Sequence, residues 1–183
     1  GTAAIPGTIS WSKMYEPVDN NIWKESEGYK ILELSNKDLV LTGMYSAGYL
    51  VQQPNLYNSH VYPIVYHLTS AGNVNWSKVY REAAGANKSL HDASGISMVD
   101  LGSSGFAVTG SEDHQDNISG NTYDGMMLFR TNTSGNITWS RHLQGASIQV
   151  GSSSDDILFN GNNLHIVGYR YVSNPPHGPG AAG

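Results

Sequence analysis

One stretch of the chain, SEDHQDNISGNTYD, gathers acidic side chains at close spacing. Carboxylate oxygens are the hard ligands that Ca²⁺ prefers, and a flexible loop lets several of them meet at one ion. The sequence therefore raises the expectation of a calcium site, with Glu112, Asp113, Asp116 and Asp124 as its ligands. The spacing D-x-[DN]-x-[DN]-G of an EF-hand loop is not met, so a solvated acidic loop without metal is the alternative. No other cofactor is expected.

Aromatic residues recur in segments that are expected to form long loops. Tyrosine and tryptophan present an apolar plate beside a polar edge, which suits contact with a sugar ring or with a protein partner. The candidate ligand-binding residues are Trp23, Tyr45, Tyr49, Tyr57, Asn117 and Tyr123. The alternative is that these side chains only pin their own loops.

The sequence carries no motif for catalysis. Its seven histidines form no H-E-x-x-H pair, and its glycine-rich stretches lack the lysine of a phosphate-binding loop. The adjacent carboxylates Asp155 and Asp156 would serve a glycosidase only on the floor of a pocket, where the sequence cannot place them. We therefore assign no catalytic residue and expect a protein that binds rather than catalyses.

Composition narrows the class of protein. The chain has 183 residues, enough for one domain with a sizeable core, and only 14% of them are charged. Abundant Gly, Ser, Asn and Tyr are typical of an extracellular β-protein, so we expect an extracellular or cell-surface location. The net charge of −5 and the scattered Lys and Arg residues argue against nucleic acid as a partner. No apolar run approaches the ~20 residues of a membrane span, and the absence of cysteine excludes disulfides and thiolate chemistry.

A repeat organises the chain. Trp11, Trp76 and Trp139 lie 65 and 63 residues apart (76 − 11 and 139 − 76). Around the last two, PIVYHLTSAGNVNWS and MMLFRTNTSGNITWS align without a gap. Each is preceded by a second shared motif that contains glycine, KDLVLTGMYS and then SGFAVTGSED, and a third version, NNLHIVGYRY, follows Trp139. Two motifs that recur in the same order indicate a structural repeat.

Each repeat is expected to form four short strands. In the middle copy these are DASGISMVDL, GFAVTGS, DGMMLFRTN and ITWSRHL, with glycine and asparagine in the turns. The second and third strands are apolar on both faces, as expected when four-stranded antiparallel sheets stack face to face. This pattern predicts an all-β fold built from the blades of a β-propeller. The repeated tryptophan is then a packing residue between neighbouring blades, rather than a sugar-stacking or catalytic group.

The motifs W-S-K-x-Y, V-x-G, D-G-x-x-L and S-G-N-[IV]-x-W-S, in this order over about residues 9–172, resemble the repeats of secreted and cell-surface β-propeller proteins of bacteria. The resemblance implies surface display, adhesion or glycan handling, without one defined activity. Pro63 departs from the pattern, because the later repeat has Met126 there. The stretch TSGNITW is also similar to the Asp-box of sialidase-like propellers, but it has one extra residue and no aspartate. A sialidase-like glycoside hydrolase fragment is therefore the least favoured alternative.

The repeats also suggest how the chain is divided. The predicted parts are a linker or terminus at 1–8, propeller repeats at 9–172 and a Pro/Gly-rich tail at 173–183; within the repeats we expect an outer strand at 9–15, blades at 26–80 and 91–143, and a partial blade at 153–172. About three blades are fewer than a ring needs. We therefore expect an incomplete ring or a segment of a larger propeller, completed by other chains or missing segments. A compact three-unit solenoid is the competing arrangement.

The long loops between the second and third strands and between blades are expected to emerge on one rim. Functional residues concentrate on loops held by a rigid scaffold. The sequence thus favours a non-catalytic extracellular binding or adhesion module that presents this rim to a glycan or a protein. The alternative is a structural subunit of a larger surface assembly or filament, with the same loops as subunit contacts.

Overall fold

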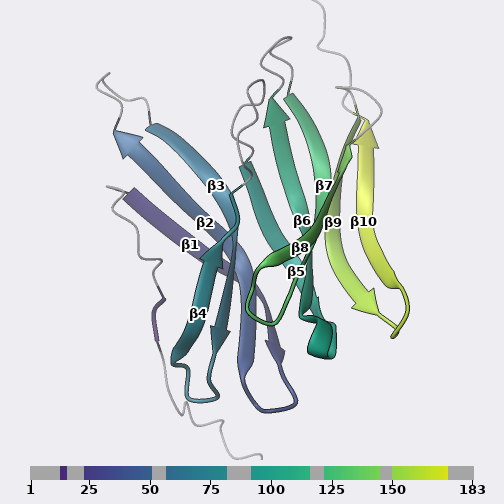
Figure 1. Ribbon diagram of the computed structural model, residues 1–183. Helices are drawn as coiled ribbons and strands as arrows, with labels where there is room; N and C mark the ends of the chain where they lie inside the picture. Colours follow the sequence, from purple (N-terminus) through teal and green to yellow (C-terminus); the bar gives the residue numbers. More distant parts are fainter. Residues whose placement is uncertain are drawn as a thin grey trace, which may run out of the picture.

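The chain folds into antiparallel β-sheets. The computed structural model describes residues 13–15, 23–50, 57–81, 92–115, 122–144 and 150–172. In this part of the chain there are ten strands and one short 3₁₀ helix, Gly102–Ser104 (Figure 1). The strands are β1 Trp23–Glu33, β2 Leu39–Leu50, β3 Tyr57–Leu68, β4 Val74–Val79, β5 Asp92–Asp100, β6 Phe106–Gln115, β7 Thr122–Thr131, β8 Ile137–Gln144, β9 Val150–Phe159 and β10 Leu164–Val172. The predicted all-β class is confirmed.

Three sheets follow the order of the chain. The first sheet is β1-β2-β3-β4, the second is β5-β6-β7-β8, and the third pairs β9 with β10. Every pairing is antiparallel between strands that are consecutive in sequence. The four strands predicted for each full repeat are therefore observed, as are the two strands of the last one. No described helix is long and apolar enough to cross a membrane.

The turns within the repeats have the same geometry in both full sheets. Gly72 and Gly135 have φ of 73° and 74°, in the left-handed region that favours glycine. Each donates its N–H to the carbonyl three residues earlier, on Thr69 and Asn132, at 2.8 and 2.9 Å. These turns explain why the dipeptide G-N precedes the tryptophan strand of both full sheets.

The second sheet repeats the pairing register of the first. In the first sheet His67 lies opposite Trp76, and in the second Arg130 lies opposite Trp139. Both partners are displaced by 63 residues (130 − 67 and 139 − 76). The register shifts immediately after His67 and immediately after Arg130, so even the irregularity recurs. The two sheets are thus structural copies.

A glycine at one place in all three sheets accommodates a bulge in the neighbouring strand. The register shifts beside Gly43, Gly110 and Gly168. A Cβ atom at these glycines would lie 1.8, 1.7 and 2.1 Å from a carbonyl oxygen of the bulged strand. No side chain fits at such distances, so the glycine of the repeated V-x-G motif is required by the close approach of two backbones.

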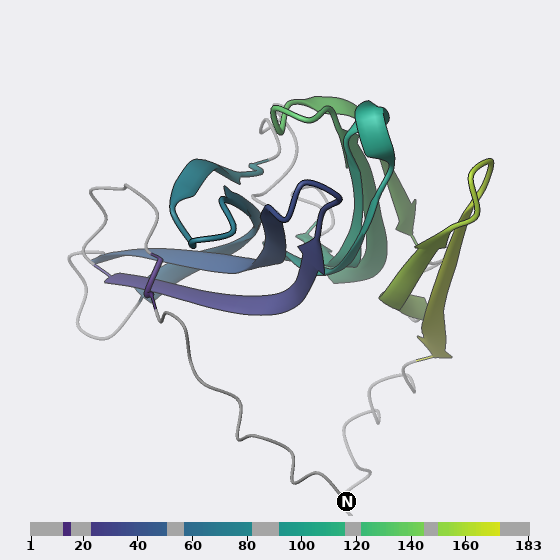
Figure 2. The ribbon, with the colours of Figure 1, turned by 90° about the horizontal axis from the view of Figure 1, so that it is seen from below.

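Apolar clusters join each sheet to the next. Figure 2 shows the three sheets following one another in chain order. One cluster brings Val40 and Val65 of the first sheet against Phe106 and Phe129 of the second. Another brings the second sheet against Ile157 of the third. The first strands β1, β5 and β9 contact one another in succession. The sheets therefore pack face to face in chain order.

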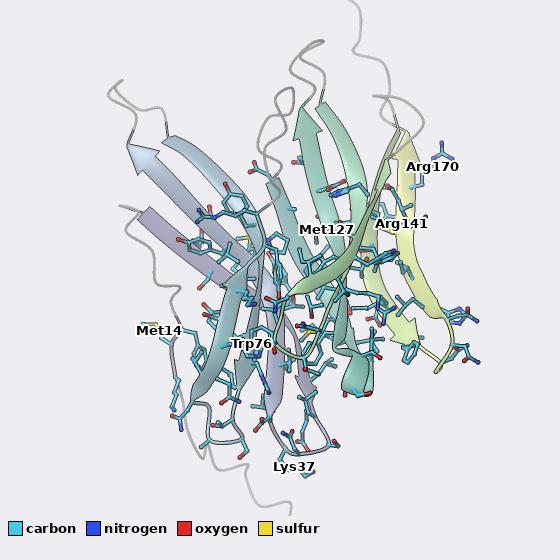
Figure 3. All side chains as sticks on the ribbon, in the orientation of Figure 1. Met14, Lys37, Trp76, Met127, Arg141 and Arg170 are labelled. Carbon is cyan, nitrogen blue, oxygen red and sulfur yellow. The ribbon has the colours of Figure 1, made fainter. Side chains whose placement is uncertain are left out.

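The repeated tryptophans pack between sheets, as predicted. Trp76 lies against Phe106 of the second sheet with 6.4 Å between ring centroids (Figure 3). Trp139 packs in the same way into the cluster shared with the third sheet. Arg141 lies over the Trp139 ring, with its guanidinium carbon 5.7 Å from the ring centroid. Trp11 is outside the described residues.

The residues that follow Trp76 anchor the first sheet to the second. Tyr80 donates its hydroxyl hydrogen to the carbonyl of Gly135 at 3.0 Å, and its ring lies 4.7 Å from that of Phe129. Lys78 donates to the side-chain oxygen of Asn136 at 2.5 Å. The W-S-K-x-Y motif is therefore a clamp on the next sheet.

Residues 13–15 make the same clamp on the outer face of the first sheet. Tyr15 donates to the carbonyl of Gly72 at 2.9 Å, and its ring lies 5.5 Å from that of Tyr66. Lys13 donates to the side-chain oxygen of Asn73 at 2.7 Å. Each of these partners lies 63 residues before its counterpart in the second sheet. The segment thus occupies, against the first sheet, the place that β4 occupies against the second, although residues 13–15 form no strand.

The third sheet leaves one face open. Leu158, Val167 and Tyr169 are 61%, 58% and 54% exposed. The equivalent of Val167 in the second sheet is Thr109, which is fully buried and donates to Ser154 of the third sheet at 2.7 Å. The face that a following sheet covers in the first and second sheets is therefore exposed in the third.

Candidate functional site

Long connections border one end of the sheets. The tight turns at 34–38, 69–73, 101–105, 132–136 and 160–163 lie together at the end marked by Lys37 in Figure 3. The strand ends that border residues 51–56, 82–91, 116–121 and 145–149 lie at the opposite end, at the top of Figure 1. We call this opposite end the connection end. The connections themselves are outside the described residues.

Strand pairing brings three of the aromatic candidates to the connection end of the first sheet. Trp23 lies opposite Gly48, Tyr49 lies opposite Asn58, and Tyr57 lies opposite Leu50. Their backbones thus occupy neighbouring register positions on three adjacent strands, although Trp23 and Tyr57 are 34 residues apart in sequence (57 − 23). The structure describes the backbone of these residues and not their side chains.

The expectation that Tyr45 lies on an exposed loop is wrong. Tyr45 lies within β2 opposite Tyr62, and it is 0% exposed. It packs with Ile64 and Tyr66 in the cluster on the outer face of the first sheet. The physical reason is that β2 and β3 pair as far as Leu50, so the hairpin is longer and its connection shorter than the sequence indicated.

The acidic candidates divide between two environments. Glu112 is 2% exposed, whereas its neighbour Asp113 is exposed, so the two carboxylates do not share one site. Asp113 lies in register between Asp92 and Asp124, on three adjacent strands. No group of three or more metal-ligating side chains occurs in the part of the chain that the structure describes.

Two further candidates, Tyr123 and Asp124, lie near the connection end of the second sheet, at the start of β7. Tyr123 lies opposite His114, and the structure describes only the backbone of both candidates. Asn117 and Asp116 are outside the described residues.

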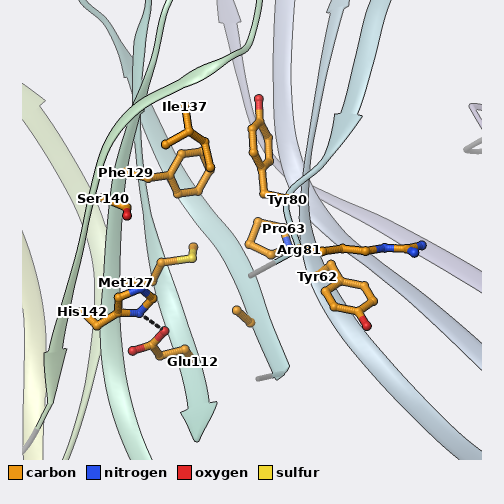
Figure 4. A pocket seen from close by; sticks show the side chains of 11 residues that line it. Tyr62, Pro63, Tyr80, Arg81, Glu112, Met127, Phe129, Ile137, Ser140 and His142 are labelled. Atoms are coloured by element: carbon orange, nitrogen blue, oxygen red, sulfur yellow. Dashed lines mark hydrogen bonds and ion pairs between the residues drawn. The ribbon is translucent and has the colours of Figure 1, made fainter. Parts of the chain in front are cut away.

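A small pocket lies between the first and second sheets. Its volume is about 80 Å³, and Tyr80, Met127, Phe129 and Ile137 supply apolar walls (Figure 4). Burial raises the pKa of Tyr80 above its ordinary value, so its phenol lines the pocket in the neutral form. The pocket is therefore largely aromatic and apolar.

A carboxylate and an imidazole meet in this pocket. Oε2 of Glu112 on β6 makes a short hydrogen bond with Nδ1 of His142 on β8 (Figure 4). Oε1 of Glu112 is also buried, and it accepts no hydrogen bond from any described residue. Leaving a buried acceptor unpaired costs about 1–3 kcal/mol, and more when it is charged. Oε1 of Glu112 therefore lacks the hydrogen-bond donor that would offset this cost.

The repeat shows what is special about this site. The positions of Glu112, Gly125 and His142 correspond in the first sheet to Tyr45, Tyr62 and Val79, from the register of the two sheets. In the first sheet these three residues belong to one apolar cluster.

The second sheet replaces that apolar set by a carboxylate, a glycine and an imidazole. Gly125 lies opposite Glu112, and a Cβ at Gly125 would be 3.1 Å from Oε1. The missing side chain at Gly125 therefore leaves room for the carboxylate. His142 was not a candidate from the sequence, although comparison of the repeats at these three positions would have indicated it.

A second polar cluster joins all three sheets. Asp156 of β9 accepts a hydrogen bond from Ser97 of β5 at 2.5 Å and one from Lys30 of β1 at 3.4 Å. These three residues each follow the bulge in the first strand of their sheet. The bond from Ser97, together with the Ile157 amide and Lys30, lowers the pKa of Asp156. Equivalent positions of successive sheets therefore converge on one point, beside a wider cavity of about 600 Å³.

Comparison with known proteins finds no matching family model, no matching curated protein and no matching solved structure. Function is therefore inferred from the geometry of the chain itself.

Proposed function

We propose that the three sheets are blades of a β-propeller of the bacterial secreted or cell-surface type, and that further blades complete the ring. Three observations support this architecture. Successive sheets share one register, equivalent positions of the first strands converge at Asp156, and residues 13–15 clamp the first sheet as a fourth strand would. A solenoid would keep equivalent positions apart along its axis, whereas blades around a central axis bring them together.

The function that fits this architecture is non-catalytic binding at the connection end, in an extracellular or cell-surface setting. The observation that carries it is that strand pairing gathers the backbones of Trp23, Tyr49 and Tyr57 at the connection end, on three adjacent strands. Aromatic residues held at the end of a rigid scaffold suit contact with a sugar ring or an extended protein segment. A glycan or a protein at a cell surface is thus the proposed partner.

Substitution of two tyrosines at the connection end tests the binding proposal. Glycan-array and pull-down binding should be lost in Tyr49→Ser with Tyr57→Ser, while circular dichroism remains that of the unaltered chain. Tyr29→Ser is the matched control, because Tyr29 is an exposed tyrosine of the same sheet at the bulge rather than at the connection end. Equal binding by the control and by the double variant would contradict the proposal.

A structural subunit of a larger assembly is the second candidate function. The exposed apolar face of the third sheet, with Leu158, Val167 and Tyr169, favours it. Sedimentation velocity over a range of concentrations separates the two candidates. A structural subunit should form ordered assemblies of defined size, whereas a binding module should bind its partner as a single chain.

A further inference from the structure

The pocket between the first and second sheets holds a feature that the fold does not need. The equivalent positions of the first sheet are filled by Tyr45, Tyr62 and Val79, which form an apolar cluster. A carboxylate with one buried unpaired oxygen is less favourable for packing than such a cluster. Stability therefore does not explain Glu112 at this position, whereas a ligand that donates a hydrogen bond to its free oxygen would explain it.

We propose that this pocket binds a primary ammonium group on a short alkyl stem. Oε2 of Glu112 is already bonded to His142, so the ligand must donate to Oε1. An ammonium group offers three donors and a positive charge, and its hydrogen bond to a carboxylate is stronger than that of a neutral donor.

The pocket walls fit the rest of such a ligand. The rings of Tyr80 and Phe129 lie 4.7 Å apart and line the pocket together with the flexible side chain of Met127. Aromatic faces attract a cation, and methionine adapts to an alkyl stem. A volume of about 80 Å³ admits a slender head group and excludes a sugar ring.

Arg81 also lines the pocket, but it donates no hydrogen bond to Oε1 of Glu112. Arg81 lies over the Tyr62 ring, with its guanidinium carbon 5.0 Å from the ring centroid. Figure 4 shows both side chains extending away from Glu112 and His142. The ammonium site is thus separate from the Arg81 guanidinium, and it does not depend on the aromatic residues at the connection end.

Titration with n-butylammonium chloride tests the site, with n-butanol as the neutral probe of similar shape. In chain labelled with ¹³C at the methionine methyl groups, the Met127 signal should shift saturably with n-butylammonium. The signal of Met14, which is 90% exposed, should not shift. We expect n-butanol to bind at least about tenfold more weakly, since it lacks the charge. Equal affinity for the two probes, or an unmoved Met127 signal, would overturn the proposal.

Glu112→Gln keeps the shape of the side chain and removes its charge. It should weaken n-butylammonium binding about tenfold, as measured by calorimetry. Glu33→Gln is the matched control, because Glu33 pairs with Lys37 at the turn end, and it should leave the affinity unchanged. Unchanged affinity in Glu112→Gln would overturn the proposal. If that variant fails to fold, the methionine titration of the unaltered chain still decides it.

The source of the ammonium group is resolved by a third probe. N-acetyl-lysine methylamide carries the same stem on a peptide backbone. Binding as tight as that of n-butylammonium supports a lysine side chain of a partner as the ligand. Binding of n-butylammonium alone supports a free amine, and absence of binding by both would overturn the ammonium site.

Discussion

At the scale of single residues, all three sheets have a glycine at one equivalent position because a neighbouring backbone leaves no room for a side chain, and not because the position needs a positive φ. Gly43, Gly110 and Gly168 have no positive φ, yet each faces a bulged carbonyl too closely for a Cβ. The bulge in turn moves Lys30, Ser97 and Asp156 to the point where the sheets converge. One small residue per sheet thus permits the polar cluster.

Gly110→Ala should therefore destabilise the chain strongly. The new Cβ would lie 1.7 Å from the carbonyl oxygen of Ser94, so a strand must move. We expect the free energy of unfolding to fall by about 3 kcal/mol, as measured by urea denaturation. Gly28→Ala is the control, because nothing lies within 4 Å of a Cβ there. Similar losses in both variants would contradict the role of the bulge.

Ser97→Ala should raise the pKa of Asp156. The Ser97 hydroxyl is the largest cause of the lowered pKa, and Lys30 contributes less. A carboxyl whose pKa is lowered by folding stabilises the protein above its ordinary pKa of 3.8 and loses that effect as the pH falls. The variant should thus be less stable above pH 3.8, by less than about 1 kcal/mol because the Asp156 carboxyl is half exposed, and the difference should vanish at more acidic pH. An NMR titration of the Asp156 carboxyl measures the shift, and an unchanged pKa would contradict the assignment.

At the scale of elements, the last strand of each full repeat attaches its sheet to the next one. In both repeats the tryptophan of this strand packs between sheets, and in the first repeat the tyrosine of the W-S-K-x-Y motif also bonds to the turn of the next sheet. Tyr15 and Tyr80 make this bond in different environments. Tyr80 is mostly buried, whereas solvent reaches the hydroxyl group of Tyr15.

Removal of the tyrosine hydroxyl should therefore lower the stability of the chain more at Tyr80 than at Tyr15. In Tyr80→Phe the carbonyl of Gly135 loses its partner away from water, and we expect a loss of about 1 kcal/mol. In Tyr15→Phe water can replace the hydroxyl at Gly72, so the loss should be much smaller. Thermal unfolding monitored by circular dichroism compares the two variants. A larger loss in Tyr15→Phe would show that residues 13–15 carry more of the stability than the packing indicates.

At the scale of the whole molecule, the stack of sheets ends on an apolar surface. The third sheet exposes Val167 where the second sheet buries Thr109 against its neighbour. Exposed apolar faces of this kind mark contact surfaces. In the propeller that we propose, a further blade would cover this surface.

Val167→Asp should accordingly reduce self-association of the chain. A charge on this face opposes burial against another sheet, so the average mass at high concentration should fall. Val74→Asp is the control, since Val74 is similarly exposed on β4 but lies on no end face of the stack. Sedimentation equilibrium measures both variants, and equal association in the two would argue against the third sheet as a contact surface.

The sequence by itself determined the four strands of each full repeat, the order of the repeats and the packing role of Trp76 and Trp139, whereas the outer strand predicted at 9–15 is not formed by the described residues 13–15. Alternation and turn residues are local rules that act over a few residues, and the repeat is found by comparing one stretch of the sequence with another. The structure confirmed these features at β5 to β8 and at the turns beside Gly72 and Gly135. The same rules placed Tyr45 on a loop, because they could not tell how far β2 and β3 remain paired.

Only the tertiary structure decided which side chains meet. Glu112 and His142 lie 30 residues apart, and Lys30 reaches Asp156 across 126 residues and three sheets. Such contacts depend on register, on the face each strand presents and on the stacking of the sheets. Each depends on residues far away in sequence, so no local pattern could specify the buried carboxylate or its unpaired oxygen.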